Sequence, residues 1–309
     1  MNMQSDATPA TPMATQSFAP ALIPESRLMY RSVIRELWEN RSIYIAPLAV
    51  AGLILVGSLI SAFRLPGKMR AVSTLDPMQQ HEVLAQHYEV AALLIMGTTF
   101  IVAVFYCLDA LHGERRDRSI LFWKSLPVSD LTTVLSKACI PVVVLPLLTF
   151  TITVVTQCLM LLISSAALLG SGLSVATLWS QLSLPQTWLD LLYHLVTIHA
   201  LWYAPIFGWL LLVSAWARRM PILWAGLPVL AIALVEKIAF NTTHFAEMLG
   251  SRLGGGPEAV SLPGASPMDP MTHLTPGHFL TSAGLWIGLA MTAAFLAAAV
   301  RLRRAQGPI

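Results

Sequence analysis

The sequence predicts an all-α membrane protein with six transmembrane helices. Only 35 of the 309 residues are charged, 19 basic and 16 acidic, which is 11% of the chain, whereas a soluble domain carries about 25%. Hydrophobic residues make up 56% and the mean hydropathy is +0.67. The charges cluster, so that residues 138–189 form 52 consecutive uncharged positions; about 20 suffice to cross a bilayer. This composition excludes a disordered chain, a fibrous repeat and an ordinary cytosolic enzyme.

The N-terminal region divides into a tail and an amphipathic segment. Residues 1–24 are rich in Ser, Thr, Pro, Ala and Met with one charge, which predicts a disordered cytoplasmic tail. In residues 25–40, arginines recur at i, i+4 and i+8 (Arg27, Arg31 and Arg35), and apolar residues occupy another face. We expect a helix lying at the membrane surface; the alternative is a cytosolic extension of the first span.

We expect a single transmembrane domain, residues 25–304, followed by a short tail, residues 305–309. Six apolar segments lie within this domain. The predicted spans are approximately residues 42–63, 89–109, 138–163, 190–215, 221–240 and 279–300. Several prolines lie inside or near their ends, and membrane helices tolerate them because neighbouring groups satisfy the freed carbonyls.

The distribution of Lys and Arg between the connections predicts the orientation. With the N-terminus inside, the inner segments hold 14 basic residues, and the outer segments hold four, Arg64, Lys68, Arg70 and Arg252. Inner loops of membrane proteins carry the excess of positive charge. We therefore expect both termini in the cytoplasm.

The connection between the second and third spans is the most distinctive stretch of the chain. A charged patch, Glu114–Arg118, leads into Ile120-Leu-Phe-Trp-Lys124 and a Leu-Pro turn, after which Ser129 or Asp130 can cap the next helix. We expect a short helix across the cytoplasmic mouth that joins two spans and exposes groups to a partner. A basic inner loop can alternatively serve only to set the topology.

At these residues the chain resembles the permease subunits of ABC-2 type transporters. The matching residues are Glu114, Arg115, Arg116, Ser119, Ile120, Trp123, Lys124, Ser125, Leu126, Pro127, Val128, Ser129 and Lys137. The resemblance implies an exporter in which this segment docks on a separate ATPase. The implied coupling residues are Glu114, Arg115, Arg116, Asp117, Arg118, Phe122, Trp123 and Lys124. The long outer loop, residues 241–278, departs from the family pattern.

The resemblance also implies the partners and the location. Two ATPase subunits, which would bind the ATP and Mg²⁺, and a second permease copy, as homodimer or heterodimer, would complete the transporter in a bacterial inner membrane, in contact with its lipids. The chain itself has no Gly-x4-Gly-Lys-Ser/Thr motif and no zinc-protease HExxH motif. We therefore expect no enzyme activity, cofactor or metal in this chain, and its net charge of +3 does not suggest nucleic acid.

Polar groups inside the spans are candidates for transport. Two roles are open to the neutral hydrogen-bonding groups of the third span: lining a passage or joining helices. These groups are Thr149, Thr153, Thr156 and Gln157. The absence of charge from the central turns of four spans favours an apolar or amphipathic cargo over a metal or sodium ion. His194 and His199, at i and i+5, would point about 140° apart on an α-helix, which argues against joint metal ligation and favours interhelical hydrogen bonds.

Two other function classes compete with the permease. An intramembrane enzyme acting on lipid-linked substrates needs clustered acids, histidines or a Ser/Lys pair, and here such residues are scattered. A secondary transporter would show related interrupted helices in its two halves, and no internal repeat is visible.

Overall fold

The computed structural model describes residues 24–72, 76–125, 128–182, 184–254 and 276–307, and these fold into helices without a strand. The predicted N-terminal tail, Leu126 and Pro127, and most of the outer loop lie outside the described residues. The helices are α1 (Glu25–Glu39), α2 (Ser42–Ala62), α3 (Leu65–Val72), α4 (Pro77–Ala110), α5 (His112–Arg116), α6 (Ile120–Ser125), α7 (Asp130–Cys139), η1 (Ile140–Val144), α8 (Leu145–Gly170), α9 (Ala176–Gln181), α10 (Leu184–His194), η2 (Leu195–Trp202), α11 (Ala204–Trp216), α12 (Pro221–Phe240), α13 (His244–Leu253), α14 (Pro276–Thr281) and α15 (Ala283–Ala305).

Five helical stretches in the described part are long and apolar enough to cross a membrane, and a sixth results if one bent pair counts as a single span. Each of the six predicted segments coincides with one of them. The bent pair is Leu184–Trp202 with Ala204–Trp216, which meet at 44°. The all-α membrane class is therefore confirmed, with five to six spans.

Two of the helical stretches are longer than the sequence predicted. α4 begins at Pro77 rather than near residue 89, because its first turns are polar yet fully compatible with a helix. The third stretch runs from Asp130 to Gly170. It passes through a π-helical turn, η1, that contains Pro141; proline lacks the N–H that a regular helical turn requires.

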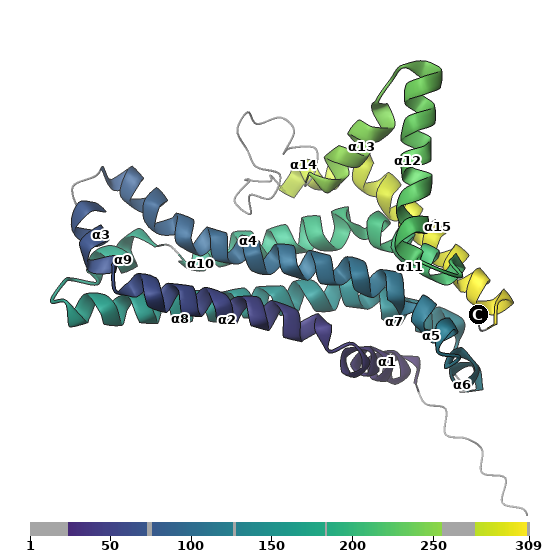
Figure 1. The fold of residues 1–309 in the computed structure, drawn as a ribbon, viewed down its shortest axis with the longest axis horizontal. Helices are drawn as coiled ribbons and strands as arrows, with labels where there is room; N and C mark the ends of the chain where they lie inside the picture. Colours follow the sequence, from purple (N-terminus) through teal and green to yellow (C-terminus); the bar gives the residue numbers. More distant parts are fainter. Residues whose placement is uncertain (1–23, 73–75, 126–127, 183, 255–275, 308–309) are drawn as a thin grey trace, which may run out of the picture.

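The long helices form a bundle with chemically different ends (Figure 1). α2 packs against α4 and α8, and α11 packs against α15 and α4. One end holds α1, α5, α6, the start of α7 and the C-terminal end of α15; we call it the charged end. The opposite end holds α3 and α9.

α12 stands away from this bundle in Figure 1 and has no buried residue. Two tryptophans near the end of α11 contact it: Trp209 Nε1 donates to the Ala225 carbonyl at 3.1 Å, and the Trp216 and Trp224 rings lie 4.9 Å apart. Its C-terminus ends at Asn241 in the left-handed conformation (φ 50°), which asparagine tolerates at helix ends. The connection to α13 is therefore a tight, polar turn.

α13 is fixed against η2 and α15 through Arg252. The guanidinium lies 4.1 Å above the Trp202 ring and donates to the Trp202 and Gly284 carbonyls. In return, Trp202 Nε1 donates to the Arg252 carbonyl at 3.1 Å. A side chain at Gly288 would meet the guanidinium, so glycine at that position leaves room for this contact.

Candidate functional site

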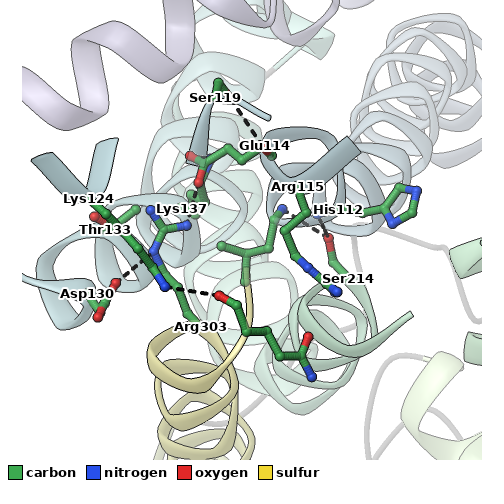
Figure 2. A network of polar contacts seen from close by, with 12 residues as sticks. His112, Glu114, Arg115, Ser119, Lys124, Asp130, Thr133, Lys137, Ser214 and Arg303 are labelled. Atoms are coloured by element: carbon green, nitrogen blue, oxygen red, sulfur yellow. Dashed lines mark hydrogen bonds and ion pairs between the residues drawn. The ribbon is translucent and has the colours of Figure 1, made fainter. Parts of the chain in front are cut away.

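The charged end contains a buried ionic cluster that joins four helices. Three acids and three bases form it, so its formal charges cancel. Its members are Arg35 and Glu36 of α1, Glu114 of α5, Asp130 and Lys137 of α7, and Arg303 of α15. We call these six residues the ionic cluster; Figure 2 shows the part around Glu114.

Lys137 lies at the centre of the ionic cluster. Its Nζ is 2.9 Å from Glu36 Oε1 and 3.1 Å from Glu114 Oε1. Its side chain is only 3% exposed, and that of Glu36 is fully buried. Tyr106 of α4 donates to the second Glu36 oxygen at 3.0 Å. One ammonium group therefore holds α1 and α5 against the first turns of the third span.

Arg303 extends the ionic cluster to the last helix. Its guanidinium forms ion pairs with Glu114 and, at 3.0 Å, with Asp130 Oδ1. The Arg303 side chain is 4% exposed. Asp130 is the first residue of α7, where the helix dipole favours an acid, and Ser129 caps that helix by accepting a hydrogen bond from the Thr132 N–H at 3.0 Å. Of the two residues predicted to cap this helix, Ser129 is the one whose side chain does so.

The electrostatics of Glu36 favour its ionised form. Burial raises the pKa of this carboxyl, but the charge and hydrogen bond of Lys137, together with Arg35, outweigh burial and lower the pKa below its ordinary value of 4.5. Burying ions is costly, and their attraction offsets that cost only when every charge has a partner. Loss of one member therefore costs more than an exposed ion pair would contribute.

α5 is attached to the end of α11 by hydrogen bonds. Ser214 Oγ accepts from the backbone N–H groups of Leu111 and His112 at 3.0 and 2.9 Å. Arg115 donates to the Ala215 carbonyl at 2.5 Å, at the helix terminus where a cation is favoured. Figure 2 shows His112, Arg115 and Ser214 converging on this point.

α6 is held from two sides. The Arg35 guanidinium lies 3.8 Å above the Trp123 ring, a cation–π contact to α1. Lys124 Nζ donates to the Gln306 carbonyl at 3.0 Å, beyond the end of α15. Arg118, between α5 and α6, has a φ of 59°, an unusual conformation for a residue with a side chain. The two short helices thus form one compact element.

The opposite side of this element is exposed. It carries both charge and apolar surface: Leu121 and Phe122 are 58% and 59% exposed, and the charged residues 116–118, shortly before them in the chain, are exposed as well. We call this surface the outer face; its residues are Arg116, Asp117, Arg118, Leu121 and Phe122. This surface is the part of the α5–α6 element that a partner protein can reach.

The structure divides the eight predicted coupling residues into two groups. Arg116, Asp117, Arg118 and Phe122 lie on the outer face, and Lys124 is also exposed. Glu114 and Arg115 are buried, at 8% and 6% exposure, and Trp123 is half-buried against Arg35. The predicted short helix is present. The buried residues hold the element in place rather than forming its surface.

Sequence reasoning missed Glu36, Arg303 and Ser214 as members of this site. Glu36 carried a usable signal, because it lies between Val33 and Leu37 on the apolar side of an amphipathic helix, where a charge needs a buried partner. Arg303 was counted only as one of three basic residues near the C-terminus, and nothing in its neighbourhood distinguishes it. Ser214 is one hydroxyl in an apolar run.

The polar residues of the third span lie inside the bundle. Thr149, Thr153, Thr156 and Gln157 are all at most 2% exposed. Gln157 donates to the Tyr88 carbonyl of α4 at 3.0 Å and accepts from Trp188 Nε1 of α10 at 2.7 Å. Thr149 and Thr156 donate to carbonyls of their own helix. Gln157 therefore joins three helices. Joining helices, rather than lining a passage, is the second of the two roles considered above for these polar residues.

Comparisons with known proteins found no relative of this chain. No protein-family model, curated protein or solved structure matches the chain.

The ionic cluster predicts unequal effects of two similar substitutions. Glu114→Gln removes the charge that pairs with Lys137 and Arg303, so we expect the free energy of unfolding to fall by about 3 kcal/mol. Asp117→Asn, its matched control, affects only an exposed pair with Arg116 and should change stability by less than about 0.5 kcal/mol. Denaturant unfolding in detergent measures both; equal losses would contradict the structural role of the ionic cluster.

Proposed function

We propose that this chain is the membrane-spanning subunit of an ABC-2 type exporter, driven by a separate ATPase that docks on the outer face. One observation carries the proposal: the α5–α6 element is exposed on one side and bound on the other to α1, α7, α11 and α15. A force applied to the outer face therefore acts on the ends of several spans at once. The resemblance around residues 113–137 points to the same element.

The coupling would use the different properties of the two faces. Arg116, Asp117 and Arg118 provide charges that orient an approaching partner, and Phe122 provides an apolar anchor. The ionic cluster resists displacement of α5 relative to α7, because separating its charges in a dry environment is costly. α7 continues into α8 without a break, so movement of the element becomes movement of the third span.

The proposal includes an orientation. The charged end lies in the cytoplasm, where the ATPase and its ATP and Mg²⁺ are found, with six spans and both termini inside. The 14-to-4 excess of basic residues supports this. A second permease copy, identical or related, and two ATPase subunits complete the transporter in a bacterial inner membrane. ATP hydrolysis is assigned to the partner, so this chain is not itself an enzyme.

Cysteine labelling from outside the cell tests the orientation. In a variant whose native cysteines are replaced by alanine, a cysteine at exposed Ser171, beyond the end of α8, should react with a membrane-impermeant maleimide. A cysteine at Asp117, which is exposed, should react only after the membrane is opened, because the proposed orientation puts it on the cytoplasmic side. The reverse pattern would reject the orientation and, with it, the proposed docking.

Co-purification tests the docking. We expect the chain, isolated from native membranes in mild detergent, to bring an ATPase with a nucleotide-binding motif and measurable ATP hydrolysis. The double substitution Arg116→Ala and Phe122→Ala should reduce the bound ATPase at least tenfold, because it removes one charge and one apolar anchor of the outer face. Leu169→Ala is the control, since Leu169 is similarly exposed (64%) at the opposite end.

Two results would contradict the docking. One is full ATPase recovery with the double variant while the variant protein inserts and folds normally. The other is an equal loss with Leu169→Ala, which would show that the effect does not depend on the outer face.

A further inference from the structure

A small, partly open cavity lies between helices of the bundle, away from the charged end. Its volume is about 150 Å³, and it lies between the middle of α4, the π-helix η2 and the end of α13. Its walls include Met96, Phe100, His194, His199, Tyr203 and Leu253. Two imidazoles in one small apolar cavity need a chemical explanation, because polar groups inside a membrane span are costly without a partner.

The π-helix brings the two histidines together. His194 immediately precedes η2 and His199 lies within it. A π-helix pairs residue i with residue i+5, so side chains five positions apart come to the same side. The ring centroids are 6.0 Å apart. The sequence-based expectation that these residues point in different directions assumed a regular α-helix and is wrong for this reason.

The spacing of the two rings suits one shared ion. A metal bound to imidazole lies roughly 3 Å from the ring centroid, since the metal–nitrogen bond is about 2.0 Å. Two rings on opposite sides of one ion are therefore separated by about 6 Å. Nδ1 of His199 is buried and has no hydrogen-bond partner among the described residues. The Tyr203 hydroxyl is already engaged, since it donates to the Leu253 carbonyl at 3.1 Å.

The donor set selects the kind of ion. The cavity offers imidazole nitrogens and, from Met96, a thioether; no carboxylate or thiolate lines it. In the part of the chain that the structure describes, no three His, Cys, Asp or Glu side chains converge on a metal site. Imidazole with thioether is a soft set that suits copper(I). The cost of burying an ion rises with the square of its charge, so a divalent ion would cost about four times as much here.

The α13 side of the cavity is held in place by Arg252. Leu253, the last residue of α13, forms part of the wall, and the preceding Arg252 fixes α13 through Trp202 and Gly284. The His199 ring packs against Tyr203 at 5.3 Å and against Phe100 at 6.2 Å. Aromatic side chains therefore surround the His199 ring and restrict its movement.

We propose that this cavity is a copper(I)-binding site formed by His194, His199 and Met96. The site belongs to the isolated chain and needs neither an ATPase nor a second copy. It can therefore be present if the proposed transport function is wrong, and absent if that function is right.

Competition for copper(I) tests the site. The full-length chain, without a polyhistidine tag, is purified metal-free in detergent and titrated anaerobically with copper(I) against a chromophoric copper(I) chelator. We expect one equivalent of copper(I) per chain and no retention of Zn²⁺ under the same conditions. His199→Ala and Met96→Leu should each weaken binding at least tenfold. His87→Ala, a histidine exposed at the opposite end, should leave binding unchanged.

The Met96→Leu variant separates binding from folding. Leucine conserves the volume of methionine, so the thermal unfolding temperature should remain that of the parent while copper(I) affinity falls. The proposal is overturned if the chelator removes all copper(I) from the parent protein, if His199→Ala binds as tightly as the parent, or if His87→Ala loses binding to the same extent. Unchanged copper(I) affinity in Met96→Leu would show that the Met96 thioether is not a ligand of the site.

Discussion

The pairing of buried charges around Lys137 is the constraint on which the charged end depends. A lone ammonium or carboxylate could not be buried there, so Glu36, Glu114 and Arg303 must all reach this point for any of them to be stable. They come from helices far apart in the sequence. The ionic cluster therefore fixes the positions of the ends of α1, α5, α7 and α15 relative to one another. Hydrophobic burial cannot fix these positions, because it is non-directional.

This arrangement explains how the short connection between the second and third spans can be both anchored and exposed. Residues 112–125 are too few to form a stable domain, and two helices of five and six residues have little intrinsic stability. Attachment to Ser214, Lys137 and Arg35 supplies the missing order. The element can then present Phe122 and its charged neighbours as a rigid surface. α12, by contrast, has no buried residue.

The sequence predicted the features that depend on local pattern. Apolar run length located the span-forming stretches of the described residues, and residue type limited the cap of α7 to Ser129 or Asp130. The sequence did not predict contacts between residues far apart in the chain. Glu114 pairs with Arg303, 189 residues away, and Arg115 with a carbonyl at the end of α11, 100 residues away. Without these partners, both residues resembled exposed loop charges. The approach of His194 and His199 escaped because it depends on π-helical geometry, and no residue type signals that geometry.

The central claim is that the ionic cluster holds the α5–α6 element rigidly on the spans. Amide hydrogen exchange of residues 112–125 measures this directly, because a loosened element opens more often. Comparison of the parent protein with Glu114→Gln should show faster exchange in this segment, with α2 unchanged as the internal reference. Identical protection of residues 112–125 in both proteins would contradict the claim, since the element would then be ordered without its buried charges.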